Sequence, residues 1–244
     1  VRLSNLEMIQ YHPTTIEIAD KVCLVSEAAR GEGGRLFVYK DNEKYYFMEE
    51  RYPELKNLMP RDVVSREMYF VSRDNGGAQV YLDMTELGEE VWEERLPDLR
   101  EEIIHYLSMD PKNDPIPVRP GIHYFMGGID VDIDHKTNVA NLYAAGEACS
   151  AYHGANRLGG NSLLGAIYGG RKAGQSVITD SKSAGYVDAN YDIEDITTAV
   201  EYKGSEFDNA RDCFIIELRD ILLSALGIVR NEALLNEGLT AIAK

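Results

Sequence analysis

A histidine, a hydroxyl, a carboxylate and an arginine lie close together near the start of the sequence, as His12, Ser26, Glu27 and Arg30. Side chains of these four types can together hold a carboxylate substrate and move a proton. Glu27 and Arg30 are three positions apart, which makes them neighbours on one turn if the stretch is helical. The same pattern also suits a surface ion pair beside a loop histidine, because Glu-x-x-Arg is common.

Two further positions extend this chemistry, and each has an ordinary structural explanation as well. Arg61 is followed by Asp62, which could be an ion pair at a helix start. His123 lies before Gly127 and Gly128, which would permit a planar ligand to approach the backbone or would make a turn. His123 itself could equally be a satisfied core histidine.

The most specific pattern is the string His-Gly-Ala-Asn-Arg-Leu-Gly-Gly-Asn-Ser at 153–162, preceded by Gly146-Glu147. Glycines and asparagine leading into a helix leave free N–H donors at a positive dipole end, which suits an anionic ligand such as a reduced flavin. Arg157 adds a guanidinium fork for a carboxylate. A capped helix after a glycine-rich loop explains the loop, but explains the whole string less well.

Local patterns predict the elements that position these residues. Two apolar stretches around a polar turn predict a hairpin over 36–48, and Pro60-Arg61-Asp62 predicts a helix start. Apolar spacing over 87–107, interrupted by Pro97, predicts amphipathic helices on the outside. Pro115, Pro117 and Pro120 predict a stiff crossing, at which we place a domain boundary.

Beyond the prolines, the sequence predicts a half-buried strand over 129–133 and a short buried strand over 142–145. A helix is predicted over 162–177 and another over 214–225, with an acidic linker at 180–207 between them. The fold class is therefore α+β, and no internal repeat is evident.

Composition excludes several classes of function. The 244 residues include 25 basic and 41 acidic side chains, a net charge of -16, which argues against nucleic acid as a partner. Three distant cysteines favour reduced thiols over a disulfide framework or a metal site. No apolar run approaches the roughly 20 residues that span a bilayer, so we expect no direct membrane insertion. The first residue is Val1, and we expect a piece of a longer protein.

Six motifs in one order resemble the flavoprotein subunits of the succinate dehydrogenase and fumarate reductase family, within the FAD-dependent oxidoreductases. They are His-Pro-Thr, Ser-Glu-x-x-Arg-Gly-Glu-Gly-Gly, Pro-Arg-Asp-Val-Val, His-Tyr-x-Met-Gly-Gly, Ala-Ala-Gly-Glu and the string at 153–162. The resemblance covers about 6–174, and 218–239 resembles the start of the family's C-terminal helical domain. The stretch 39–53 resembles the enzymes of Gram-positive type.

The resemblance implies a role for each matching residue. His12 and Ser26 would hold one carboxylate of succinate or fumarate, and His123 and Arg157 the other. Arg61 would be the proton donor and acceptor, with Glu27 and Arg30 as its relay to solvent. The residues that would contact FAD are Glu147, Asn161, Ser162 and Leu163. Without the resemblance Glu27 would be the base, because a guanidinium is almost never deprotonated.

The resemblance implies interconversion of succinate and fumarate by hydride transfer with FAD, which does the redox chemistry. The fingerprint Gly-x-Gly-x-x-Gly occurs nowhere suitable in the sequence. We therefore expect FAD binding to be weak or absent, and activity to be absent, in this chain alone. Two alternatives stay open: an L-aspartate oxidase-like flavoenzyme, and a non-catalytic interaction fragment.

By resemblance the chain divides into a capping domain at 1–120, the C-terminal part of a Rossmann-like FAD-binding domain at 121–180, and the linker and start of a helical domain at 181–244. The resemblance also implies an iron-sulfur subunit and a membrane anchor as partners. These would place the complete protein in the cytoplasm, at the inner face of the cell membrane.

Overall fold

A computed structural model describes residues 1–18, 21–184 and 205–243. The chain forms two compact units, Val1–Ser176 and Val177–Lys244, and each is described by itself. Helices and strands both contribute, so the predicted α+β class is confirmed. None of the helices in these ranges is long and apolar enough to cross a bilayer.

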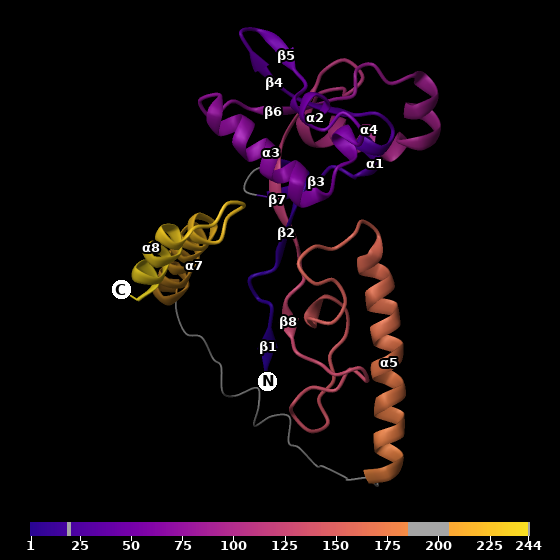
Figure 1. The fold of residues 1–244 in the computed structure, drawn as a ribbon, viewed down its shortest axis with the longest axis vertical. Helices are drawn as coiled ribbons and strands as arrows, with labels where there is room; N and C mark the ends of the chain where they lie inside the picture. The colour runs from indigo at the N-terminus through magenta and orange to yellow at the C-terminus, as the bar shows by residue number, and fades with distance from the viewer. Residues whose placement is uncertain (19–20, 185–204, 244) are drawn as a thin grey trace. The chain divides into compact units, whose positions relative to one another are not determined.

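The first unit contains a six-stranded sheet of order β3-β2-β7-β6-β4-β5, in which all neighbouring strands are antiparallel (Figure 1). The strands of this sheet are β2 (Ile9–Ile18), β3 (Lys21–Leu24), β4 (Arg35–Lys40), β5 (Glu43–Tyr45), β6 (Val80–Asp83) and β7 (Ile116–Phe125). A second sheet pairs β1 (Leu3–Ser4) with β8 (Gly128–Ile129).

Strand β7 connects the two halves of the larger sheet. Its first residues pair with β6, and the rest pair with β2, the strand that carries His12. Pro117 and Pro120 lie inside β7, next to an irregularity in the ladder between His12 and Thr15. Prolines lack the N–H that a regular ladder needs, so a bulge is the expected accommodation. The proline-rich segment is thus a strand, and the domain borders after 120 and 180 stay a prediction.

Helices cover this sheet, and further helical segments follow its last strand in the chain. In the first unit they are α1 (Ala28–Gly31), α2 (Phe47–Arg51), α3 (Arg61–Asp74), α4 (Pro97–Leu107), the short turns η1 (Lys56–Leu58), η2 (Val91–Arg95) and η3 (Gly146–Ala148), and the start of α5 (Asn161–Ala184). The predicted helix after Pro60 is confirmed as α3. The predicted hairpin is confirmed as β4–β5, but its second strand ends at Tyr45 because Phe47 and Met48 turn into the core as α2.

The hydrophobic core lies between the sheet and these helices. Leu36, Val38 and Leu82 from the strands are fully buried against Val64 and Met68 of α3. Full burial of such a side chain contributes about 1.5–3 kcal/mol. The core therefore fixes α3, and with it Arg61 at its first position, against the sheet.

The two strands predicted at 129–133 and 142–145 are wrong. Strand β8 stops at Ile129, and Ile133 is 82% exposed. The carboxylate of Asp132 accepts N–H groups of Asp134 and Lys136, which is the local bonding that favours turns over strands. The second segment contributes only an isolated bridge between Lys136 and Tyr143.

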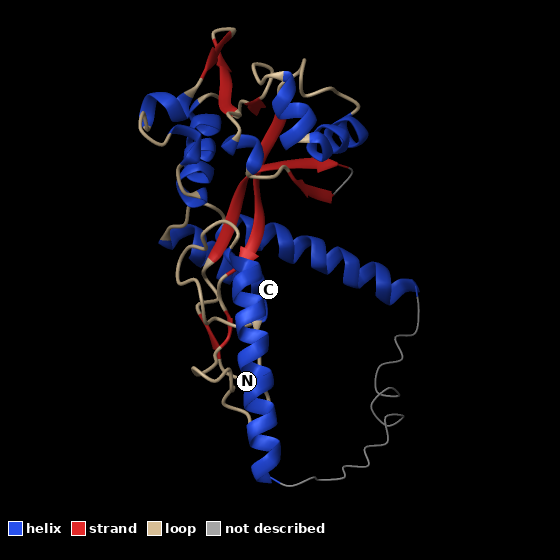
Figure 2. Cartoon of the chain, turned by 90° about the vertical axis from the view of Figure 1, so that its right-hand side faces the viewer, coloured by secondary structure: helices blue, strands red, loops and turns tan. Residues whose placement is uncertain are grey.

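Helix α5 confirms the predicted helix and extends it at both ends, and Figure 2 shows it as one uninterrupted helix. A Cβ atom at Gly169 would lie 1.8 Å from the Tyr152 hydroxyl oxygen, whereas a Cβ at Gly170 would meet nothing within 4 Å. Gly169 therefore has no room for a side chain, whereas its neighbour Gly170 does.

We expect Gly169→Ala to lower the free energy of unfolding by about 1–3 kcal/mol, because the Tyr152 ring must move. Gly170→Ala is the matched control, and should raise it by about 0.5–1 kcal/mol through helix propensity. Denaturant unfolding of the purified chain measures both. Equal effects of the two substitutions would contradict the packing of Tyr152 on α5.

The second unit contains α7 (Ser205–Ala225), which confirms the predicted helix at 214–225, and α8 (Glu232–Ile242). Asn231 caps α8 by accepting the N–H of Leu234 at 3.0 Å. Gly238 of α8 lies against Ala225 of α7, where a Cβ would come within 2.5 Å of the Ala225 Cβ. The predicted linker at 180–207 overlaps the ends of α5 and α7, and its remainder lies outside the described residues.

Candidate active site

His12 is the most buried of the predicted site residues, with no solvent exposure. Strand β2 places it opposite Gly121 of β7. Its Nδ1 atom receives the backbone N–H of Thr14 at 3.3 Å. Because a backbone N–H can only donate, Nδ1 acts as the acceptor and the neutral ring carries its proton on Nε2.

The Nε2 atom of His12 is buried and bonds to nothing within the described residues. Burial, followed by the charges of Arg61 and Arg30, lowers the pKa of His12 to about 2. The ring is therefore neutral at physiological pH, and it presents one unsatisfied N–H donor. A buried donor without a partner costs about 1–3 kcal/mol, which an anionic ligand would recover.

The low pKa of His12 makes stability depend on pH. The unfolded chain protonates this histidine below its ordinary value of 6.5, but the folded chain does not, so stability falls as pH falls below 6.5. At pH 5 the loss from this residue is about 2 kcal/mol relative to pH 8. We expect His12→Gln to lose about 2 kcal/mol less than the parent chain between these pH values, in denaturant titrations. An equal loss in both proteins would contradict this.

His123 lies beside His12, and Arg157 lies close enough to His123 for its charge to act on that ring. The rings of His12 and His123 meet edge to face, with centroids 5.2 Å apart. Burial, followed by the charges of Arg61 and Arg157, lowers the pKa of His123. The Arg157 guanidinium lies over the ring of Tyr124 at 4.5 Å, and is 3% exposed.

Arg157 is only partly satisfied by these contacts. Its Nη1 reaches the Leu158 carbonyl at 3.5 Å, and its Nε is buried without a hydrogen-bond partner in the part of the chain that the structure describes. Burial, followed by the charge of Arg61, lowers its pKa. His12 Nε2 and Arg157 Nε are therefore two buried donors without a hydrogen-bond acceptor among the described residues.

Arg61, Glu27 and Arg30 form one continuous ion cluster. Arg61 Nε and Nη2 donate to Glu27 Oε2 at 3.0 and 2.5 Å, and Arg30 Nη2 lies 3.3 Å from Glu27 Oε1. Burial opposes ionisation of Glu27, but the hydrogen bond and charge of Arg61 and the charge of Arg30 outweigh it and lower the carboxyl pKa. Glu27 thus bridges two guanidinium groups. It is the N-cap residue of α1, which contains Arg30, so the stretch is helical and the two side chains are neighbours.

Ser26, of the four residues predicted to bind substrate, is the one that the structure places apart from the buried cluster. It is exposed, and its hydroxyl accepts the N–H of Ala28 at 3.2 Å, at the start of α1. Its predicted role in substrate binding stays a prediction.

The four residues predicted to contact a flavin gather at two places. Asn161, Ser162 and Leu163 form the first turn of α5, where Leu163 is 67% exposed. Glu147 is exposed, and its carboxylate accepts the N–H of Phe125 at 2.9 Å. The structure therefore leaves an accessible helix N-terminus beside a glycine-rich loop, an arrangement that suits an anionic or planar ligand.

Charge in the cluster opposes the charge of the whole chain. Three guanidiniums, of Arg30, Arg61 and Arg157, are set against the carboxylates of Glu27 and Glu147. The formal net charge of the chain is -16, yet this site has an excess of positive charge. A multiply charged anion would balance it.

Three residues of the cluster were not predicted from the sequence. Gln10 connects Arg61 to the 156–157 segment, and Thr14 sets the proton position on His12. Gly159 packs so closely that a Cβ there would lie 2.8 Å from Glu27 Oε2. Gln10 and Thr14 flank the histidine in the sequence, and their alternation with it in a strand was the available signal.

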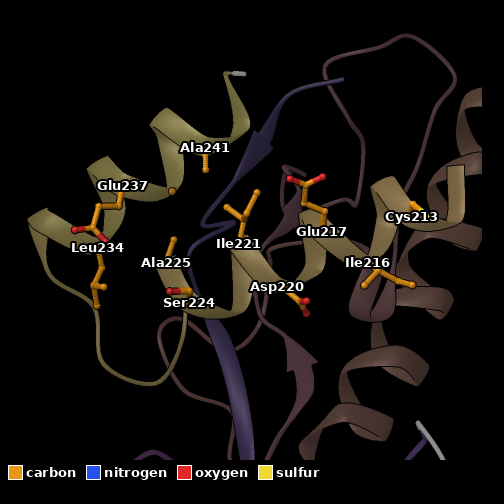
Figure 3. A pocket seen from close by; sticks show the side chains of 11 residues that line it. Cys213, Ile216, Glu217, Asp220, Ile221, Ser224, Ala225, Leu234, Glu237 and Ala241 are labelled. Atoms are coloured by element: carbon orange, nitrogen blue, oxygen red, sulfur yellow. The ribbon is translucent and has the colours of Figure 1, made fainter. Parts of the chain in front are cut away.

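The second unit contains a groove of its own. It has a volume of about 620 Å³ and lies between α7 and α8, where Ile221 and Ala225 face Ala241 (Figure 3). The ionisable residues that line it are Cys213 and three acidic residues, Glu217, Asp220 and Glu237. None of the predicted site residues lines it.

The family model described as "FAD binding domain" matches residues 1–163. The chain belongs to this FAD binding domain family. The match includes every predicted site residue, from His12 to Leu163. Flavin chemistry is therefore the chemistry of the family to which these side chains belong.

Curated relatives are named as succinate dehydrogenase flavoproteins, fumarate reductase flavoproteins or L-aspartate oxidases. The succinate dehydrogenase flavoprotein subunit of Bacillus subtilis is 45% identical over 72% of this chain and 31% of its own length. L-aspartate oxidase 2 of Ralstonia nicotianae is 36% identical over 99% of this chain and 42% of its own length. The resemblance to succinate dehydrogenase and fumarate reductase flavoproteins is confirmed, and the chain spans less than half the length of either relative.

Solved structures agree with the fold. Escherichia coli quinol fumarate reductase matches with a TM-score of 0.82 at 32% identity, over 99% of this chain and 44% of the solved one. Mycobacterium smegmatis Sdh1 matches with a TM-score of 0.70 at 31% identity, over 99% and 41%. Both similarities extend over 99% of this chain.

Proposed function

We propose that this chain carries the dicarboxylate site of a succinate dehydrogenase or fumarate reductase flavoprotein, which interconverts succinate and fumarate. The observation that carries the proposal is the convergence of two unsatisfied buried donors, His12 Nε2 and Arg157 Nε, in a positively charged cluster. Such a cluster is costly unless an anion completes it.

In this proposal the substrate is fixed by its two carboxylates. Arg157 and His123 hold one of them, with the guanidinium oriented by the Tyr124 ring. His12 donates a hydrogen bond from Nε2–H to the other carboxylate, and the exposed Ser26 hydroxyl assists it. A substrate fixed at both ends is held in one orientation, which supplies much of the acceleration in such reactions.

Proton transfer is assigned to Arg61. Its Nε and Nη2 are oriented by Glu27, so the side chain has one fixed direction, and Glu27 in turn contacts Arg30. This contact path supports the proposed relay Arg61–Glu27–Arg30. Glu27 cannot readily act as a free base, because both guanidiniums stabilise its ionised form.

FAD, when bound, accepts or supplies the hydride. The residues that would hold it are Glu147 and the first turn of α5, Asn161 to Leu163. The accessible N-terminus of α5 fits the negative charge of a reduced flavin. The exposed Leu158 and Leu163, at 66% and 67%, fit the apolar face of a planar ring.

We expect the purified 244-residue chain to bind FAD weakly or not at all, since it has no Gly-x-Gly-x-x-Gly fingerprint for the dinucleotide. Flavin absorbance after gel filtration measures this. The control is the complete flavoprotein with the same residues in place, which should retain one FAD. Stoichiometric FAD on the 244-residue chain would contradict the expectation.

The activity test uses the complete flavoprotein with artificial electron carriers. Succinate oxidation or fumarate reduction, without oxidation of L-aspartate, is the expected result. Turnover of L-aspartate instead would assign the site to the second candidate, which the L-aspartate oxidase relatives favour. Turnover of neither substrate, with FAD bound, would favour the remaining alternative, in which this chain has a non-catalytic interaction role.

We also propose partners for the complete protein, on the ground that the Bacillus subtilis relative is named as a subunit. An iron-sulfur subunit would pass electrons, and a membrane anchor would hold the complex at the cytoplasmic face of the cell membrane. Co-purification of the complete protein with these two subunits tests this.

A further inference from the structure

A ring of side-chain amides and charges joins the start of α3 to the segment that carries Arg157. Arg61 Nη1 donates to Gln10 Oε1 at 3.1 Å, and Gln10 Nε2 donates to Asn156 Oδ1 at 2.9 Å. Asn156 Nδ2 then donates to Asp62 Oδ1 at 3.0 Å. Because Asp62 follows Arg61 in the chain, the ring closes.

Every link of this ring has only one possible donor direction. A guanidinium has no acceptor, so the atom of Gln10 that faces Arg61 must be its oxygen. A carboxylate has no donor, so the atom of Asn156 that faces Asp62 must be its nitrogen. The two amides are thereby oriented head to tail, and neither can turn over without setting like groups against each other.

The ring also binds the backbone of Arg157. The Nε2 atom of Gln10 donates a second hydrogen bond, at 2.6 Å, to the Arg157 carbonyl oxygen. Gln10 is 2% exposed, and its bonds to the Arg61 guanidinium and the Arg157 carbonyl are buried. One buried amide therefore contacts the Arg61 guanidinium and the main chain of Arg157 at the same time.

We propose that Gln10, Asn156 and Asp62 are positioning residues that hold Arg61 and Arg157 in one fixed relative geometry. The inference deepens the proposed function, on which it rests for the roles of the two arginines. Gln10, Asn156 and Asp62 themselves are assigned no contact with the proposed substrate or with the flavin. They act by keeping Arg61, the proposed proton donor, at a fixed distance from Arg157, the proposed carboxylate-binding residue.

The test is a reversal of one link. Asn156→Asp sets two carboxylates against each other where a hydrogen bond of 3.0 Å stood, yet it can still accept from Gln10. Adding Asp62→Asn restores the link with the donor reversed, since the new amide donates to the new carboxylate. Asp62→Asn alone still accepts from Asn156, and loses only the exposed ion pair with Arg66.

The first readout is deuterium uptake at residues 154–160 in the purified 244-residue chain. We expect Asn156→Asp to raise exchange in this segment about tenfold or more, because a hydrogen bond to a charged group is lost. The double variant should return to within about threefold of the parent. This readout needs neither flavin nor turnover, so it stands even if the proposed function fails.

The second readout is kcat/KM for the dicarboxylate in the complete flavoprotein. Asn156→Asp should lower it about 10- to 100-fold at unchanged FAD content, and the double variant should recover it to within about threefold. Unchanged exchange in Asn156→Asp, or a double variant no better than the single one, would overturn the inference. A parent protein inactive toward dicarboxylates would overturn the proposed function instead, and leave the exchange result to decide the ring.

Discussion

Arg61→Lys is expected to reduce kcat of the complete flavoprotein about 10²- to 10⁴-fold, the usual contribution of a positioned general acid. Lysine keeps the charge but has no planar fork. Arg61 donates from three nitrogens, two toward Glu27 Oε2 and one toward Gln10 Oε1, and a single ammonium cannot reproduce that orientation.

Binding should survive this change. His12, His123 and Arg157 remain, and the local positive charge is preserved, so the Kd of the unreactive dicarboxylate malonate should stay within about tenfold. The matched control is Arg66→Lys, one turn later on α3, where an exposed ion pair with Asp62 is all that changes. Stopped-flow turnover and malonate titration separate the two effects. A kcat within tenfold of the parent would remove Arg61 from proton transfer.

Arg157→Leu is expected to raise the Kd for malonate about 100-fold or more, because it removes the proposed bidentate partner of one carboxylate. Stability should not fall with it. Arg157 is 3% exposed, its Nε has no hydrogen-bond partner among the described residues, and its charge lies close to that of Arg61. Replacing a poorly satisfied buried charge by an apolar side chain is often neutral or stabilising.

This combination distinguishes a binding residue from a structural one. Isothermal titration with malonate and thermal unfolding are both measured on the complete flavoprotein. The control is Arg119→Leu, which removes an exposed ion pair with Glu17 on the same sheet and should leave the Kd unchanged. If Arg157→Leu lowers Tm by many degrees and leaves binding of malonate intact, the guanidinium serves the fold instead.

Local signals in the sequence predicted the helices and the hairpin well. Pro60 before Arg61 marked the start of α3, and apolar spacing marked α5 and α7. The failure at 129–133 has a local cause. Alternating aspartates predict the exposed face of a strand, whereas Asp132 accepts nearby backbone N–H groups and makes a turn.

The long-range part of the fold could not be predicted from the sequence. Strand β2 exists because it pairs with β7, more than one hundred positions away, as in His12 opposite Gly121. Neither strand has a clear local alternation around its prolines. Pairing of this kind depends on the whole chain, and local propensity does not encode it.

The candidate site was predicted as a set of residues, but its connections were not. The resemblance supplied His12, His123, Arg61 and Arg157, and the structure brings them together. No local pattern joins Gln10 to Arg61 across 51 positions, or to Arg157 across 147. Such contacts follow from tertiary packing, so Gln10 had no signal beyond its place beside the histidine.

The most direct test of this account is a crystal structure of the complete flavoprotein with malonate bound. We predict one carboxylate within hydrogen-bond distance of His12 Nε2, the other on the Arg157 guanidinium beside His123, and Arg61 facing the carbon between them. Malonate bound elsewhere, with His12 Nε2 and Arg157 Nε still unpartnered, would contradict the central claim.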